Sequence, residues 1–479
     1  MFRNMKWMNL SSMPKGKILL SAGVVAASSL FAAHQYDMWA NHNTTQILRY
    51  GDDSIMNGIL SRCSTLTSEP FTPNFFLSNL HAQTVFNALF RQSVDDNTLP
   101  ITRKCYTFKD GTSVYLDWIE AIDEQDRINI KPRATLFIVP GVVSGTDGVG
   151  VKHIVVRAIK CGYRCVVFNY LSEDELHKNH KCIIPGGTCR TKDFTTVIKS
   201  VKRDIGNDCP LIAVGISLGA NILANYLGSV VGKGCPPVDN PLPLLYDGDV
   251  PQDVVIHDVD EEQVLAKAKQ PDHKVNDFSS AILIANPYRL ALATRNLHKS
   301  KVHRTLYDNT FIPRRKQLFA KNVDVLLPMY MERRGISDVE AARKELLEKI
   351  WSCETTREMD RDLTMPLHER NFNVKYKNVD EFYETESCEN CIDKIQIPTI
   401  CVNATDDPIS PSEVIPSIFE KVIESKNPNV VFVVTKKGGH SGWVDGILPY
   451  WGPTWIERSV IQCLDAMMVV NGNKNKSLA

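Results

Sequence analysis

Short apolar runs recur between residues 135 and 435, and segments with helical periodicity separate them. The runs are rich in valine and isoleucine and carry few polar residues on either face. They are residues 135–139, 165–170, 211–214, 281–285, 399–402 and 430–435. Strands buried on both faces belong to mostly parallel sheets covered by helices, because a solvated face requires polar residues at every second position. The pattern therefore predicts an α/β fold.

Three other patterns complete this picture. Residues 104–108 and 113–118 flank Asp110-Gly111, a dipeptide that favours tight turns, so they predict an antiparallel hairpin before the parallel strands. Residues 231–278 interrupt the alternation with an acidic stretch, which we expect to be an inserted loop. Residues 289–393 are mainly helical and are expected to form a cap or lid.

One cap helix has a clear start in the sequence. Residues 338–351 are amphipathic, Ser337 precedes them, and Glu340 follows three residues later. This spacing predicts a capping box, in which Ser337 is the N-cap residue.

The N-terminus has the pattern of a membrane-targeting segment. Arg3, Lys6, Lys15 and Lys17 precede residues 18–33, which carry no charge. That run is intermediate in length between a cleaved signal peptide and an uncleaved anchor. The basic residues before this run indicate that residues 1–17 are a cytoplasmic tail. Together with Tyr36 and Trp39 after the run, they favour a single-pass type II anchor at residues 18–36. A buried soluble helix is the alternative.

This topology places the remaining chain in the lumen of the endoplasmic reticulum, in another endomembrane compartment or at the cell surface. Residues 37–100 would then be a stem and N-terminal extension, 101–466 the α/β domain and 467–479 a polar tail. The sequon Asn43-Thr44-Thr45 would be available for glycosylation.

Charge and cysteine content exclude several classes of function. Fifty-five Lys and Arg balance fifty-five Asp and Glu, so no basic footprint for nucleic acid is present. Thirteen cysteines are scattered along the chain, and some are expected to be free. Cys388 and Cys391 form a single CxxC, expected to be a surface loop with two thiols or one local disulfide. No motif implies a metal, a nucleotide or another cofactor.

The clearest chemical signal surrounds Ser217. The sequence Gly215-Ile216-Ser217-Leu218-Gly219 follows an apolar run and precedes residues 220–227, which have a helical pattern. A serine at such a sharp strand-to-helix turn is held clear of the sheet, and glycines on both sides prevent a clash between the helix and the strand. We therefore predict that Ser217 is a nucleophile.

A serine nucleophile requires a base and an orienting carboxylate, and both follow later strands. Asp406 and Asp407 come after the run at 399–402, and His440 comes after the run at 430–435. All three groups would lie at the same edge of a parallel sheet, in the order Ser, Asp, His that α/β-hydrolases use. Asp407 is favoured over Asp406 because Pro408 holds it extended, although Asp406 stays open.

The same geometry requires backbone donors for the oxyanion that forms when the serine attacks. Leu218 follows the nucleophile and would donate one N–H. The loop after residue 139 would supply the other, and Val142 is the expected donor.

Taken together, these residues resemble the AB hydrolase 4 family, which includes membrane-anchored alpha/beta-hydrolase lipases and esterases. The resemblance covers residues 72–455, and several motifs carry it. They are Asn79-Leu80-His81-Ala82-Gln83-Thr84, Pro140-Gly141, residues 215–221, Ala285-Asn286-Pro287, residues 403–408 and residues 438–442. The resemblance implies an α/β-hydrolase fold, a catalytic triad of Ser217, Asp407 and His440, and lipid ester substrates such as monoacylglycerols, phospholipids or fatty acyl esters.

The function expected from the sequence is therefore that of a serine carboxylic-ester hydrolase acting on lipids. Transfer of the acyl group to an alcohol by the same triad is one alternative. A catalytically silent lipid-binding receptor on the same fold is another, although such a protein would be expected to lack a triad residue.

Overall fold

The computed structural model describes most of the chain outside its first 44 residues. Described are residues 29, 33, 45–69, 71–91, 99–107, 112–123, 129–142, 144–169, 181–182, 192–229, 256–258, 277–372, 374–446 and 452–477. The expected anchor at 18–36 and acidic insertion at 231–278 lie almost wholly outside these residues. In the part of the chain that is described, no helix has the length and apolar character needed to cross a membrane.

Within the described residues, eleven strands form one sheet. They are β1 (Thr45–Leu48), β2 (Ile101–Thr107), β3 (Thr112–Ile119), β4 (Thr135–Val139), β5 (Arg164–Asn169), β6 (Lys181–Cys182), β7 (Leu211–Ile216), β8 (Ile256–Asp258), β9 (Ser280–Ile284), β10 (Thr399–Ala404) and β11 (Val430–Thr435). The order is β1-β11-β10-β9-β7-β4-β5-β3-β2-β8, with β6 beside β3. Strands β11, β10, β9, β7, β4 and β5 are mutually parallel. The predicted parallel sheet is confirmed.

The antiparallel pairing predicted for the hairpin is confirmed, whereas the expected turn at Asp110-Gly111 lies outside the described residues. Strands β2 and β3 pair antiparallel, with Ile101 opposite Ile119 and Thr107 opposite Ser113. β3 in turn pairs antiparallel with β5, so the hairpin extends the parallel sheet on one side.

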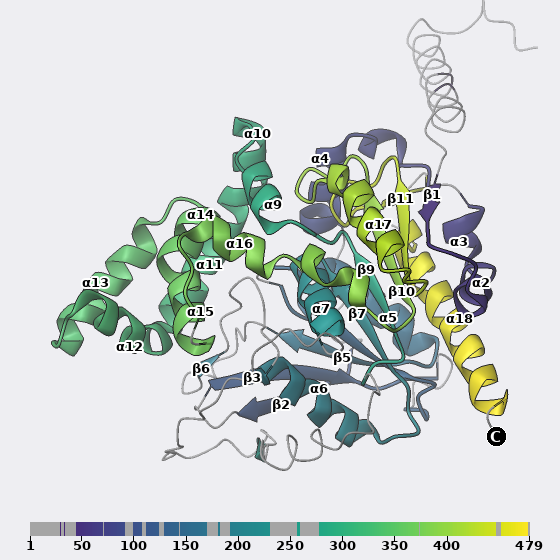
Figure 1. Cartoon of the computed structure of the whole chain (residues 1–479), viewed down its shortest axis with the longest axis horizontal. Helices are drawn as coiled ribbons and strands as arrows, with labels where there is room; N and C mark the ends of the chain where they lie inside the picture. The colour runs from purple at the N-terminus through teal and green to yellow at the C-terminus, as the bar shows by residue number, and fades with distance from the viewer. Residues whose placement is uncertain are drawn as a thin grey trace, which may run out of the picture.

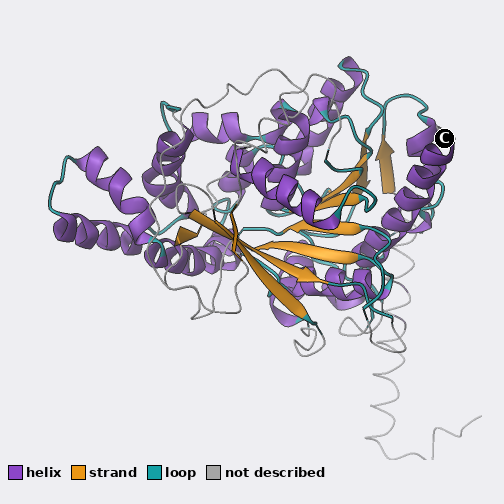
Figure 2. Ribbon diagram, turned by 90° about the horizontal axis from the view of Figure 1, so that it is seen from below, coloured by secondary structure: helices purple, strands orange, loops and turns teal. Residues whose placement is uncertain are grey.

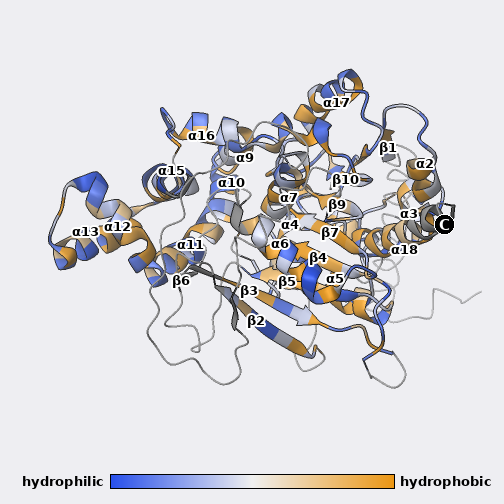
Figure 3. Ribbon diagram, turned by 60° about the horizontal axis from the view of Figure 1, so that its bottom comes forward, coloured by the Kyte–Doolittle hydropathy of each residue, from blue (hydrophilic) through white to orange (hydrophobic). Residues whose placement is uncertain are grey.

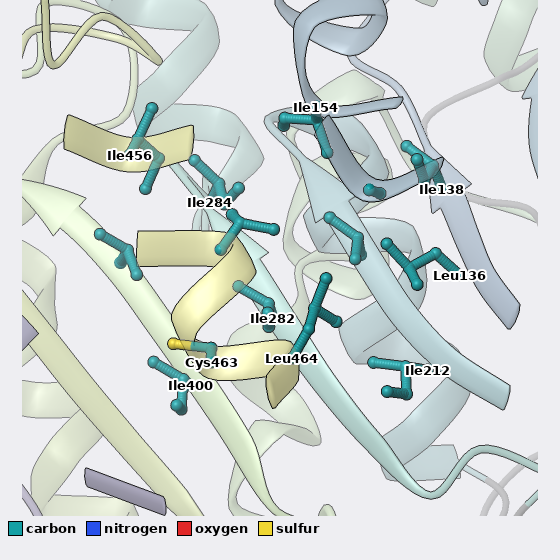
Figure 4. Packing of buried hydrophobic residues seen from close by; sticks show 14 of the residues in the cluster. Leu136, Ile138, Ile154, Ile212, Ile282, Ile284, Ile400, Ile456, Cys463 and Leu464 are labelled. Carbon is teal, nitrogen blue, oxygen red and sulfur yellow. The ribbon is translucent and has the colours of Figure 1, made fainter. Parts of the chain in front are cut away.

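Helices cover both faces of this sheet (Figure 2). One face packs against α6 (Lys192–Ile205), α7 (Leu218–Ser229) and α17 (Ile415–Glu424). The other face packs against α5 (Val149–Lys160) and α18 (Trp455–Ser477), with α2 (Ser54–Leu60) and α3 (Ser64–Thr67) beside them. In Figure 4, Ile456, Cys463 and Leu464 of α18 lie over isoleucines of the central strands. The fully apolar strands are thus enclosed as their sequences require.

A helical cap follows β9 and projects to one side of the sheet (Figure 1). Its helices are α9 (Leu290–Asn296), α10 (Lys301–His303), η6 (Arg304–Asp308), α11 (Asn309–Lys321), α12 (Val323–Arg334), α13 (Val339–Ser352), α14 (Thr356–Met359), η7 (Asp360–Thr364), α15 (Met365–Phe372) and α16 (Val379–Glu386). The cap has a hydrophobic core of its own, which includes Phe319, Leu326 and Leu346. Figure 3 shows mostly apolar central strands, whereas α12 and α13 mix polar and apolar positions.

Short helices join these layers. Between β1 and β2 lie η2 (Phe75–Leu77), α4 (Leu80–Val85) and η3 (Phe86–Phe90). On either side of β10 lie η8 (Cys388–Asn390), η9 (Ile392–Lys394) and η10 (Ser412–Val414).

Both ends of the domain pack against distant parts of the chain. Within residues 37–100, the expected stem and N-terminal extension, β1 pairs antiparallel with β11 and Met56 and Ile59 of α2 are buried. Residues 467–479 are not merely a polar tail, because α18 continues to Ser477 and Met467 is fully buried. Both segments are stabilised by contacts with distant parts of the chain.

Two local expectations are also wrong. Helix α13 begins after Asp338, whose carboxylate accepts the N–H groups of Glu340 and Ala341, so Asp338 is the N-cap in place of Ser337. The CxxC is not a surface loop or a disulfide, because Cys388 is fully buried and both thiols are free. It packs between the sheet and α7.

Candidate active site

Three neighbouring loops at one edge of the sheet bring the predicted triad together. Ser217 follows β7, Asp407 follows β10 and His440 follows β11. Because β7, β9, β10 and β11 are parallel neighbours, their carboxyl ends open at the same edge. Residues that are 223 positions apart in the chain therefore meet.

Ser217 occupies a sharp turn between β7 and α7. Its φ angle is 54°, a left-handed conformation that non-glycine residues rarely adopt. A Cβ atom at position 215 would lie 2.6 Å from the Cα of Ala220, and one at position 219 would collide with the carbonyl oxygen of Val139. Only glycine fits at both positions, so the turn can hold the serine hydroxyl above the sheet.

The three side chains form a continuous hydrogen-bonded relay. The Oγ atom of Ser217 lies 2.7 Å from Nε2 of His440, and Nδ1 of His440 lies 2.9 Å from Oδ2 of Asp407. The carboxylate of Asp407 also accepts the backbone N–H groups of Ile409 and Ser410, at 2.8 and 2.7 Å. Its side chain is completely buried, so the carboxylate is fixed in one orientation. This geometry allows His440 to accept the serine proton.

Asp406 has a different environment from Asp407. Its carboxylate accepts the backbone N–H of Gly439 at 2.9 Å and lies 3.8 Å from Nζ of Lys437. Burial raises the pKa of Asp406 above its ordinary value, although the Gly439 N–H and Lys437 oppose that rise. Of the two candidates that the sequence left open, the structure places Asp407 at the imidazole.

The expected oxyanion donors lie beside the nucleophile. Val142 and Leu218 line the same cavity as Ser217 and His440. The preceding loop passes close to the serine, since a Cβ atom at Gly141 would lie 3.3 Å from that of Ser217. The location therefore suits two donors to an oxyanion, and their individual roles stay a prediction.

A mostly apolar cavity leads from the triad towards the cap. Its empty space is about 690 Å³ when the open solvent at its mouth is counted with it. Its lining residues come from loops that follow the strands and from the cap helices α9, α11, α14 and η7. They are Val142, Ser217, Leu218, Pro287, Leu290, Ala293, Thr294, Leu297, Phe311, Arg315, Thr356, Asp360, Ile409 and His440. Such a lining suits a hydrocarbon chain.

Arg315 and Asp360 add a pair of opposite charges to this mostly apolar lining. They form a buried ion pair, in which a guanidinium nitrogen lies 2.6 Å from Oδ1 of Asp360. Tyr383 donates a hydrogen bond to the other carboxylate oxygen at 2.7 Å. No local pattern indicates this pair, because its partners lie 45 residues apart on separate cap helices.

Sequence reasoning also missed the contacts that surround His440. Thr84, in a motif noted only for its family resemblance, accepts the backbone N–H of His440 at 2.9 Å. Among the described residues, no group of three or more His, Cys, Asp or Glu side chains is arranged to hold a metal ion.

Several curated proteins align with most of this chain. It is 28% identical over 412 residues to the embryogenesis-associated protein EMB8 of Picea glauca, a match that covers 85% of this chain and 75% of that protein. It is 25% identical over 362 residues to the phospholipase ABHD3 of Homo sapiens, covering 75% and 70%. It is 22% identical over 430 residues to the human monoacylglycerol lipase ABHD2, covering 89% and 87%. No family model matches.

These curated relatives belong to the AB hydrolase 4 family. The resemblance based on sequence motifs is therefore confirmed. Among solved structures, the esterase Pf2001 of Pyrococcus furiosus is similar with a TM-score of 0.39 and 12% identity, over 79% of this chain and 98% of that one.

Proposed function

We propose that this protein is a serine hydrolase that cleaves the carboxylic esters of lipids. The observation that carries the proposal is the relay from Ser217 through His440 to Asp407, which opens into an apolar cavity. The relatives named as a phospholipase and a monoacylglycerol lipase support lipid esters as the substrate class.

The reaction follows from the positions of these atoms. The Ser217 Oγ atom attacks the ester carbonyl carbon while its proton moves to Nε2 of His440. Asp407 stabilises the imidazolium through Nδ1, and the N–H groups of Leu218 and Val142 stabilise the oxyanion. The alcohol leaves with the proton from His440, and water then releases the fatty acid from the acyl-enzyme. Transfer to an alcohol would differ only in this last nucleophile.

The apolar lining of the cavity supplies binding energy for the acyl chain. Leu290 and Ala293 of α9 and Leu297 just after it form one wall of the cavity, and Phe311 of α11 adds to it. Burying each methylene of a chain in such an environment contributes about 0.8 kcal/mol. A substrate with an extended hydrocarbon group is therefore preferred over a short ester such as acetate.

The experiment that tests this proposal uses the full-length protein and a fluorophosphonate probe. We expect wild-type protein to be labelled and Ser217→Ala to lose labelling and hydrolysis together. Ser229→Ala is the matched control, because Ser229 lies at the far end of α7 and bonds only to the carbonyl of Tyr226 among the contacts observed. A panel of monoacylglycerols, phospholipids and ethyl esters, assayed with and without added alcohol, separates substrate classes and acyl transfer. Folded wild-type protein that neither labels nor turns over any ester would contradict the proposal.

For its location, the protein is proposed to be a single-pass type II membrane protein with its hydrolase domain on the lumenal or outer side. The basic residues before the uncharged run at 18–33 support this orientation. Glycosylation at Asn43 is the expected consequence. An Asn43→Gln variant should lose a glycosidase-sensitive mass increment, and alkaline extraction should leave the protein in the membrane fraction. Extraction into the soluble fraction would exclude the anchor.

A further inference from the structure

Helix α4 (Leu80–Val85) packs directly against residues 438–444, which form the loop that carries His440 and are called the His440 loop below. This helix lies in the first of the family-like motifs, residues 79–84, and the reaction described above gives that motif no role. The side chains of two adjacent residues of α4, Gln83 and Thr84, reach the loop at two separate points.

Thr84 contacts the catalytic histidine itself through a single hydroxyl. Its Oγ1 atom accepts the backbone N–H of His440 at 2.9 Å and donates to the carbonyl of Leu80 at 2.9 Å. The side chain is largely buried, so water has little access to replace it. The Leu80 bond orients the hydroxyl so that its lone pair faces the histidine backbone.

Gln83 holds the far end of the same loop with both ends of its amide. Its nitrogen donates to the carbonyls of Leu77 and Val444, at 2.7 and 2.9 Å, and its oxygen accepts the N–H of Val444 at 2.7 Å. The side chain is completely buried. The amide therefore pairs with Val444 in the same way that a neighbouring strand would.

The loop requires such external support because its backbone is unusual. Four of its residues have positive φ angles: Gly438 (149°), Gly439 (58°), Ser441 (58°) and Trp443 (45°). For Ser441 and Trp443 this conformation is strained and persists only where surrounding contacts fix it. At Gly439, an added Cβ atom would lie 2.7 Å from both Leu80 O and Thr84 Oγ1, so α4 leaves no room for a side chain.

We propose that Thr84 and Gln83 are positioning residues for catalysis, which hold the His440 loop so that the imidazole reaches Ser217 and Asp407 at once. The inference rests on the proposed hydrolase function. His440 must keep separations of 2.7 and 2.9 Å on opposite sides of its ring, so a small displacement of its backbone lengthens one of them. A misplacement of about 1 Å can cost roughly a hundredfold in rate.

Three substitutions at Thr84 test this role. Thr84→Val keeps the shape and removes the hydroxyl, Thr84→Ala removes it without adding a methyl group, and Thr84→Ser retains it. We expect Val and Ala to lower kcat by about 10- to 100-fold, with KM changed by less than about threefold, because chain binding is untouched. Fluorophosphonate labelling should slow in parallel. Thr84→Ser should restore kcat to within about threefold of wild type.

Thr67→Val is the matched control. The hydroxyl of Thr67 donates to the carbonyl of Cys63, four residues earlier, as Thr84 does to Leu80, but no hydrogen bond observed among the described residues joins Thr67 to residues 438–444. This variant should keep wild-type kcat. Each variant is assayed well below its own melting temperature, so that unfolding does not contribute.

The outcomes separate the inference from the proposed function. If wild-type protein fails to react with the probe, the hydrolase proposal fails. If wild-type protein reacts and either Thr84→Val or Thr84→Ala, whichever folds, keeps wild-type kcat, the positioning role is wrong. Equal losses in Thr84→Ser and Thr84→Ala would also overturn it, because the hydroxyl would then not be the feature that matters.

Discussion

Two adjacent aspartates show how strongly single residues depend on their surroundings. The carboxylate of Asp407 accepts hydrogen bonds from two backbone N–H groups and contacts the imidazole of His440. The carboxylate of Asp406 accepts the backbone N–H of Gly439 and lies 3.8 Å from Nζ of Lys437. The two residues lie at a turn after β10, where the N–H of Asp407 donates to the carbonyl of Ala404, and only Asp407 is directed at His440. The backbone geometry therefore gives the two aspartates different roles, and only Asp407 acts on His440.

This division predicts unequal effects of the two isosteric substitutions. Asp407→Asn should lower kcat by about four orders of magnitude, because an amide cannot stabilise the imidazolium and favours the wrong tautomer of His440. Asp406→Asn should keep kcat within about tenfold of wild type, since an amide oxygen still accepts the Gly439 N–H. Steady-state hydrolysis of one ester by the two purified variants distinguishes them. Similar losses in both would contradict the assignment.

The raised pKa of Asp406 also predicts a pH dependence of stability. Burial makes the folded protein hold this proton more tightly than the unfolded chain does. The stabilising contribution is fully present below the unfolded pKa of about 3.9 and is lost as the pH rises through the higher folded pKa. The melting temperature of Asp406→Asn minus that of wild type should therefore be more positive at pH 7 than at pH 3. A difference in melting temperature that is constant with pH would refute this.

At the residue scale, the sequence predicts the groups that react but not those that hold them. Ser217, Asp407 and His440 follow strands that can be recognised locally, and the order of strands brings them to one edge. Thr84 meets His440 across 356 positions, and neither residue has a local pattern that indicates the contact.

The cap illustrates the same limit at the scale of elements. Its position between β9 and β10 and its helical content follow from the sequence, because amphipathic periodicity is local. How its helices pack is decided by pairs such as Arg315 and Asp360, which meet only in the folded state. The start of α13 shows that even a local capping pattern can mislead, because Ser337 was the expected N-cap and Asp338 takes that position.

The buried ion pair predicts a large stability effect within the cap. Arg315→Met should destabilise the protein by about 3–5 kcal/mol, because it leaves Asp360 buried without its cation. Arg343→Met is the matched control, since Arg343 and Asp324 form a pair that is well exposed to solvent, and its cost should be about 0–1 kcal/mol. Urea denaturation of both variants measures the difference. Equal midpoints would show that Arg315 and Asp360 contribute no more than a surface pair.

Helix α4 also connects the cap to the triad. The hydroxyl of Tyr307, in η6 of the cap, lies 2.6 Å from Nδ1 of His81, three residues before Thr84. Tyr307 packs with Ile409, which lines the substrate cavity. A movement of the cap would therefore act on the same helix that holds the His440 loop.

At the scale of the whole molecule, the two ends of the chain complete the fold. Arg91 and Glu457 form a buried ion pair between the N-terminal segment and α18, and Cys63 lies 3.6 Å from Cys463. The sequence predicted a stem with an N-terminal extension at one end and a polar tail at the other, and it did not indicate that the two ends pack together. Their burial depends on each other, so local periodicity could not reveal it.

Met467 tests whether the end of α18 belongs to the core. Met467→Ala should destabilise the protein by about 2–5 kcal/mol, because the side chain is completely buried. Val469→Ala, two residues later on the same helix and 44% exposed, should change stability by less than about 0.5 kcal/mol. Thermal melts of the two variants give the comparison, and equal shifts would mean that this part of α18 does not pack as described.

Strand β1 has one consequence for the solubility of the chain. By pairing with β11, it covers the outer edge of the sequence Val-Val-Phe-Val-Val-Thr, a six-residue segment with no charge and no proline. Without residues 45–48, the hydrogen-bonding groups of this segment would face solvent, where they can recruit the same strand of another molecule and begin aggregation. Four residues near the N-terminus thus keep the strand that precedes the catalytic histidine from becoming a site of self-association.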